Sequence, residues 1–183
     1  MIGTNIGKKV AIALAILAVV IAAIYLVPRV RVKAPTEVQR VPEETRSVTI
    51  FFGNKQGDGF VSEAREVPAA QIFEEQVQAV VCELIKGPRD SDKIHAIPPG
   101  TELNQVFWVE DSQTLFLDFN AALSANHPGG STGEYFTIGT ILKTISANFP
   151  QVTRVQFLID GNAVESIAGH YAVDKPVEIK TWR

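Results

Sequence analysis

The stretch GGSTGEYFTIGTILKTI, residues 129–145, decides how the chain is interpreted, because a glycine-rich loop that enters a helix can also bind phosphate. A P-loop needs a lysine and a hydroxyl directly after its last glycine, whereas Glu134 follows Gly133 here. The spacing of a dinucleotide fingerprint is also missing. The Ser-x-x-Glu pattern instead predicts a capping box, formed by Ser131 and Glu134. We therefore expect a helix start, with a bound anion as the alternative.

After residue 46, segments whose apolar residues have the spacing of a strand alternate with segments whose apolar residues have the spacing of a helix. Apolar residues recur at helical spacing over 69–86, and Gly87 with Pro88 ends that helix. A second apolar stripe follows the opening stretch: Ile138, Ile141, Leu142, Ile145 and Phe149. Period-two patterns predict strands at 47–53, 59–67, 103–109, 114–120 and 152–160, with a turn at Asp160-Gly161 into one more. These elements predict an α+β fold, a two-layer sandwich of a mixed or antiparallel sheet with two long helices.

An apolar run precedes this domain. Residues 10–27 carry no charge over 18 positions, which as a helix would cover nearly the hydrocarbon thickness of a bilayer. We predict one uncleaved transmembrane helix at 10–27 after a short basic segment at 1–9. A cleaved signal peptide and a buried core helix are the alternatives. No cysteine lies near the end of the run, which argues against a lipoprotein anchor.

The predicted domain organisation continues with a juxtamembrane linker at 28–46 and one domain at 47–183. Residues 34–46 carry two prolines and charges of both signs without apolar periodicity, which is typical of a tether. Of the 17 basic residues, 12 follow residue 33, together with all 20 acidic residues, so the formal charge of that part is −8. Such a negative field disfavours nucleic acid as a partner.

Residues that could carry chemistry do not form a known pattern. His95, His127 and His170 lie in different expected loops, without the spacing of a metal site, and no nucleophile elbow is present. We predict no catalytic residues, no metal and no cofactor. Cys82, the only cysteine, is expected to be a half-buried thiol, with an intermolecular disulfide as the alternative. Asp118 is expected to be solvated or to bond to a turn.

Several short motifs follow one another along the domain. They are Leu84-x-x-Gly87-Pro88, Ile97-Pro98-Pro99-Gly100-Thr101-x-Leu103, LFLDFN at 115–120, GGSTGE at 129–134, Thr144, and VQFLIDG at 155–161. In this order they resemble the GerMN domain of sporulation and spore germination proteins, over about residues 46–171. The resemblance implies a small α+β domain outside the cytoplasmic membrane, without established catalytic activity and similar to domains that oligomerise in envelope complexes. Members often carry a lipoprotein cysteine or a second copy, whereas this chain has one copy and a plain apolar run.

These observations lead to two hypotheses of function and one that we disfavour. The first is a membrane-anchored, extracytoplasmic interaction or assembly domain, with cell-envelope proteins or further copies of the chain as partners. Its expected interface residues are the aromatic side chains predicted to be exposed, Phe136, Phe51 and Trp108. The second is a module that binds peptidoglycan or another glycan, with Trp108 or Tyr135 as the stacking surface. A hydrolase would require His127, Glu134 and His170 to converge in one cleft.

Overall fold

The structure is a computed structural model that describes residues 4–26 and 44–182, with side chains in the first range described for residues 11–22. The chain divides into two compact units, Met1–Val41 and Pro42–Arg183. Most of the linker predicted at 28–46 lies outside the described residues. The second unit begins its first strand at Thr45, so the last two residues of that predicted linker belong to the domain.

The N-terminal unit contains the helix α1, Thr4–Leu26. Among the residues that the structure describes, no helix is both long enough and apolar enough to cross a membrane. The ends of the predicted span, at residue 10 and at residues 23–27, lie outside the described side chains.

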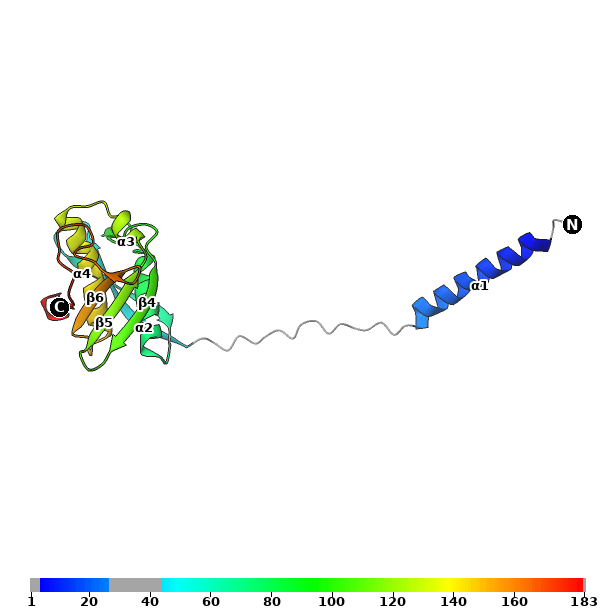
Figure 1. Cartoon of the computed structure of the whole chain (residues 1–183), viewed down its shortest axis with the longest axis horizontal. Helices are drawn as coiled ribbons and strands as arrows, with labels where there is room; N and C mark the ends of the chain where they lie inside the picture. Colours follow the sequence, from blue (N-terminus) through cyan, green and yellow to red (C-terminus); the bar gives the residue numbers. More distant parts are fainter. Residues whose placement is uncertain (1–3, 27–43, 183) are drawn as a thin grey trace. The chain divides into compact units, whose positions relative to one another are not determined.

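The second unit is an α+β domain built from two sheets (Figure 1). Its first sheet has the order β2-β1-β3, and its second has the order β4-β5-β6-β7, with β8 also paired to β6. The strands are β1 (Thr45–Asn54), β2 (Phe60–Pro68), β3 (Lys93–Ile94), β4 (Leu103–Val109), β5 (Thr114–Phe119), β6 (Arg154–Ile159), β7 (Asn162–Ala163) and β8 (Val177–Glu178). The helices are α2 (Phe73–Ile85), α3 (Ala122–Ala125), α4 (Ser131–Asn148) and the 3-10 helix η1 (Ile179–Trp182).

The predicted hairpins are confirmed. β1 and β2 pair antiparallel, as do β4 and β5. Asp160 and Gly161 both have positive φ, of 47° and 77°, as a tight hairpin turn between β6 and β7 requires. Gly87, with φ 87°, follows the end of α2 as expected. β5 and β6 are parallel, because the connection between them runs through α3 and α4.

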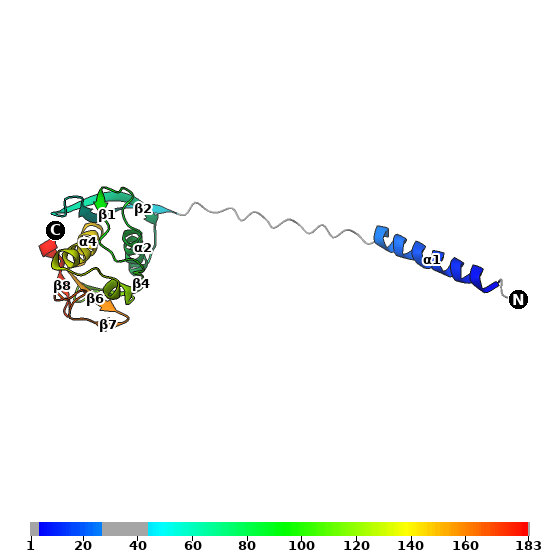
Figure 2. The ribbon, with the colours of Figure 1, turned by 90° about the horizontal axis from the view of Figure 1, so that it is seen from above.

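The prediction of two layers is wrong, because the helices have a sheet on both sides. Figure 2 shows α2 and α4 between the sheet of β1 and β2 and the sheet that contains β4, β6 and β7. The core accordingly takes apolar side chains from both sheets, such as Ile50 and Phe157, and from both helices. The predicted apolar stripe of α4 is buried, but so are Phe136, Thr137 and Thr144, which lie off that stripe.

The edge of β1 that faces α4 is covered by helix side chains. The side-chain amide of Asn148 donates to the carbonyl of Thr49 at 2.7 Å, and its oxygen accepts from the Thr49 amide at 3.0 Å. The hydroxyl of Thr144 accepts from the amide of Phe51 at 3.0 Å. Further along the same edge, Gly53 pairs with Ile94 of β3. The strand edge therefore has partners, and α4 is held in register along β1.

A buried arginine joins the other strand of this sheet to α2. The guanidinium of Arg65 contacts the carboxylates of Glu63 and Glu83 at 2.6 and 3.0 Å. It also donates to the carbonyl oxygen of Gly87 at 2.6 Å, at the end of the helix. Because a buried charge is tolerated only when it is paired, this network fixes the position of α2 against β2.

Candidate functional site

The N-terminal end of α4 is built around a buried carboxylate. The helix begins at Ser131, so Gly130 occupies the N-cap position, and no side chain forms a capping bond there. Glu134 is fully buried, and its carboxylate accepts from the backbone amides of Ile167 and Ala168, each at 2.9 Å, and of His170 at 2.8 Å. The predicted capping box of Ser131 and Glu134 is therefore wrong. The carboxylate of Glu134 bonds to a loop that is distant in the sequence, and not to the first turn of its own helix.

The environment of Glu134 keeps it ionised. Burial by itself would raise the pKa of this carboxyl, but the backbone amides of Ala168, His170, Ile167 and Tyr171 lower it below its ordinary value. The ring of His170 also approaches the carboxylate, with Nδ1 3.3 Å from Oε2. With both carboxylate oxygens occupied by amides, Glu134 acts as the anchor that holds the loop before β8 on the helix.

A second set of bonds joins this end of α4 to two loops. The amide of Gly129 donates to Nδ1 of His127 at 2.9 Å, so the ring proton belongs on Nε2, which lies 3.1 Å from the hydroxyl of Thr137. That hydroxyl donates to the carbonyl oxygen of Ala96 at 2.6 Å. Partial burial lowers the pKa of His127, although the charge of Glu134 opposes this effect. The ring is therefore neutral, and both of its nitrogens have structural partners.

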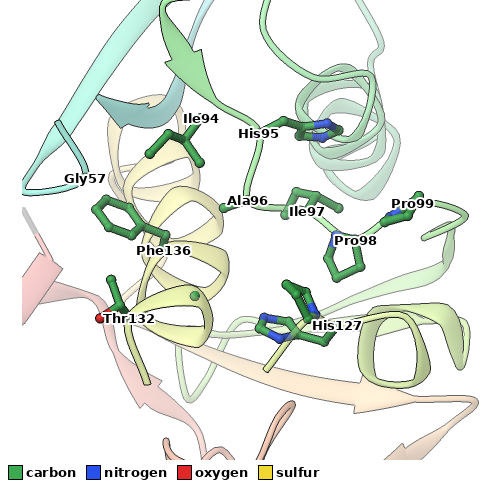
Figure 3. A pocket seen from close by; sticks show the side chains of 12 residues that line it. Gly57, Ile94, His95, Ala96, Ile97, Pro98, Pro99, His127, Thr132 and Phe136 are labelled. Carbon is green, nitrogen blue, oxygen red and sulfur yellow. The ribbon is translucent and has the colours of Figure 1, made fainter. Parts of the chain in front are cut away.

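These loops enclose an apolar cavity, which we call the α4 pocket (Figure 3). Its volume is about 340 Å³, within the range of small-ligand sites. In Figure 3, Phe136 and Ile94 lie on one side, and Pro98 and His127 lie on the other. The remaining lining residues are Gly57, His95, Ala96, Ile97, Pro99, Pro128, Thr132 and Gly133. An apolar cavity of this size fits an apolar side chain or a small apolar group.

A smaller hollow adjoins the α4 pocket and shares Gly57, Thr132 and Phe136 with it. We call it the tyrosine cleft, because Tyr135 and Tyr171 form its aromatic part, with ring centroids 6.0 Å apart. Its volume is about 180 Å³, and its other lining residues are Asp58 and Ser131. The two hollows differ in chemistry: the first is mainly apolar, and the second combines aromatic rings with hydroxyl and carboxylate groups.

The three aromatic residues predicted at an interface are less exposed than expected. Phe136 is 5% exposed, so the prediction of an exposed ring is wrong, although its side chain forms part of the wall of the α4 pocket. Phe51 is half-buried, with the Lys143 ammonium 5.7 Å from its ring centroid. Trp108 is half-buried and packs on Phe73 at 5.1 Å. An interface role for Phe51 and Trp108 stays a prediction.

The surroundings of Cys82 and Asp118 agree with the structural roles predicted for them. Cys82 is half-buried, as expected, and burial raises the pKa of its thiol, opposed by the charge of Lys86. Asp118 accepts from the amide of Gly161 at 2.7 Å, which confirms the predicted turn bond. In the part of the chain that the structure describes, no group of three metal-binding side chains is found.

The structure brings together part of the trio that a hydrolase would need. His170 meets Glu134, but His127 bonds to Gly129 and Thr137 instead. Sequence reasoning missed the role of Thr137, and it missed the buried Arg65. One signal was available for the threonines: Thr137, Thr140 and Thr144 recur at helical spacing, which is the pattern of a second buried face.

Comparisons with known proteins agree with this fold. The Germane family model, described as sporulation and spore germination, matches residues 49–165. A search of curated proteins found no match.

Three solved structures are similar to the chain. A Clostridium perfringens protein described as a lipoprotein is 22% identical with a TM-score of 0.52, over 73% of this chain and 87% of that one. The tandem GerMN domains of the sporulation protein GerM from Bacillus subtilis are 14% identical with a TM-score of 0.57, over 75% of this chain and 48% of theirs. The first GerMN domain of the same protein is 16% identical with a TM-score of 0.53, over 73% and 95%. At these identities the structures establish the shared fold alone.

Proposed function

Because the chain belongs to the Germane family of sporulation and spore germination domains, we propose that it is a non-catalytic interaction domain of the cell envelope. Its partner is another envelope protein or a further copy of the chain. The contact is made at the α4 pocket, where an apolar side chain of the partner is inserted.

The α4 pocket is the observation that carries this proposal. Its walls are mainly apolar, and the polar groups of His127 and Thr137 beside it are occupied by bonds within the domain. A catalytic site needs groups that are free to exchange protons or to attack a substrate. A pocket whose walls are mainly apolar, and whose His127 ring already has partners within the domain, is instead suited to receive an apolar anchor, the kind of contact that dominates binding energy at interfaces.

We also propose that the N-terminal segment attaches the domain to the cytoplasmic membrane by a single pass, with the C-terminal domain outside. The uncharged run at 10–27 supports the attachment. The similarity to a protein described as a lipoprotein is consistent with a domain held at a membrane surface. Orientation rests on the resemblance to envelope domains, since basic residues flank the run on both sides.

The interaction is tested by photo-crosslinking of the full-length chain in the cells that produce it. A benzoyl-phenylalanine at Pro128, an exposed residue of the pocket rim, should capture a partner or a second copy. Gly133→Leu should abolish capture, because the new side chain fills the pocket. Ala147→Leu, on an exposed position of the same helix, is the matched control and should leave capture unchanged. Capture that survives Gly133→Leu would refute a contact at this pocket.

The attachment is tested by separating membranes from the aqueous fraction and treating intact cells with a protease. The full-length chain should stay with the membrane after a salt wash, and its domain should be cleaved from outside. A deletion of residues 2–33 should move the domain out of the membrane fraction. Full-length protein in the aqueous fraction would contradict the proposed anchor.

A further inference from the structure

The tyrosine cleft differs from the α4 pocket in the chemistry that it offers. Tyr135 and Tyr171 are 37% and 36% exposed, although each also contacts another aromatic ring. Tyr135 also contacts the rings of Phe60 and Trp182, with ring centroids 5.6 and 5.0 Å away. The ring is therefore held in place while a part of it stays accessible, as a rigid stacking surface requires.

Hydrogen-bonding groups surround this aromatic surface. Asp58 lies in a turn where its Oδ1 accepts from the side-chain amide of Asn54 at 2.6 Å and its backbone amide donates to Asn54. This leaves Oδ2 of Asp58 available to accept from a ligand. Within the described residues, the hydroxyls of Ser131 and Thr132 make no bond to the protein, and both line the cleft. The cleft thus offers both acceptors and hydroxyl donors in a fixed arrangement.

We propose that the tyrosine cleft binds a pyranose unit of a neutral glycan. The apolar C–H face of a pyranose stacks on an aromatic ring, and its hydroxyls bond to carboxylate and hydroxyl groups at the ring edge. The formal charge of −8 after residue 33 and the carboxylate of Asp58 disfavour an anionic polymer. A purely apolar ligand would leave the hydroxyls and the carboxylate desolvated without partners, so it suits the cleft less well than a sugar.

The site is distinct from the contact proposed for the α4 pocket. Gly57, Thr132 and Phe136 line both hollows, but the two tyrosine rings and Asp58 line only the cleft. Loss of glycan binding and loss of a protein partner can therefore be separated by variants: Tyr171→Ala and Asp58→Asn act on the cleft, whereas Gly133→Leu acts on the pocket.

The test is titration calorimetry of the full-length chain with N-acetylglucosamine tetramer and with glucose tetramer of the cellulose type. The chain is kept in a detergent that has no sugar headgroup, because such a headgroup would compete with the tetramers for the cleft. At least one tetramer should bind, and Tyr171→Ala should weaken binding by about tenfold, in line with the loss of one aromatic contact. Asp58→Asn keeps the shape of the side chain and should weaken binding by a smaller factor.

Phe107→Ala provides the matched control, because it removes an exposed aromatic ring, 48% accessible, from β4 outside the cleft. It should leave the affinity unchanged. The proposal is overturned if neither tetramer binds at millimolar concentration, or if Phe107→Ala weakens binding as much as Tyr171→Ala. It is also overturned if an extended apolar peptide binds in place of the sugars and Tyr171→Ala abolishes that binding. Gly133→Leu should retain glycan binding, whatever its effect on protein capture.

Discussion

The two ends of α4 use polar side chains in opposite ways. At the C-terminal end, Thr144 and Asn148 bond to backbone groups of β1 and close a strand edge. At the N-terminal end, Glu134 and Thr137 tie three loops together, and the loops leave two hollows open between them. One helix therefore closes a strand edge at one end and supports two hollows at the other.

The largest effect is expected from Glu134→Gln. A neutral amide cannot accept from all of the backbone amides that now share the carboxylate, and its own N–H groups face other donors. The free energy of unfolding should fall by about 3 kcal/mol at pH 7, as expected when buried donors lose their acceptor. Urea denaturation of the full-length chain measures this loss, with the exposed Glu165→Gln as the control.

The same variant makes a prediction about pH. The pKa of Glu134 is lower in the folded chain than its ordinary value, so its stabilising effect is present above that ordinary value, about 4.3. The effect disappears as the pH falls through the lowered folded value. The stability difference between wild type and Glu134→Gln should therefore shrink below about pH 4. A difference that stays constant down to pH 2 would show that the carboxylate charge contributes nothing.

Between the two ends of α4, the backbone at Gly139 packs closely against the rings of Phe60 and Trp182. A Cβ there would lie 2.3 Å from a ring atom of Phe60 and 2.7 Å from one of Trp182. Gly139→Ala should therefore destabilise the fold by about 2 kcal/mol, even after the gain in helix propensity. At the open end, Gly133→Ala meets only His127 at 3.4 Å and should be neutral or slightly stabilising. Equal effects of both substitutions on the thermal midpoint would contradict the contrast.

A moderate effect is expected at the closed end. Asn148→Ala removes the partner of both backbone groups of Thr49, and the free energy of unfolding should fall by about 1.5 kcal/mol. Hydrogen exchange measures the local effect of the substitution, because the amide of Thr49 loses its acceptor and should exchange faster in the variant. Asn104→Ala, which removes an exposed amide with one long contact of 3.4 Å, should leave that exchange rate unchanged.

The smallest effect on stability is expected from Gly133→Leu, although it should abolish partner capture. The side chain extends into a cavity instead of a packed core, and the first turn of the helix gains propensity. The free energy of unfolding should change by less than about 1 kcal/mol, measured by the same urea denaturation. A loss much larger than this would mean that the α4 pocket is not open to a side chain.

Much of the fold was predictable because the spacing of apolar residues along the sequence indicates the local secondary structure. The period-two pattern around Ile50 predicted β1, and Asp160-Gly161 predicted the turn after β6. The number of layers was not predictable in this way. Thr137 and Thr144 are polar residues outside the apolar stripe of the helix, yet they are buried, and their hydroxyls bond to distant parts of the chain.

The candidate site was less accessible to sequence reasoning. Ser131 and Glu134 fit a capping box by spacing, and the same spacing is compatible with a carboxylate that turns toward residues 167–170. Nothing local distinguishes the two arrangements, because the amides that decide between them follow more than 30 residues later. The exposure of Phe136 was misjudged for a related reason, since its cover comes from Phe60 on another element, at 5.1 Å.

By itself, the sequence determined the α+β class, the hairpins, the two long helices and the family of the domain, because periodicity, turn residues and short motifs are local properties of the chain. The tertiary structure alone decided that α4 lies between two sheets and that its first turn carries a loop anchor beside two hollows. Those features depend on contacts between residues far apart in the chain, and a buried polar group is stable only once such partners reach it.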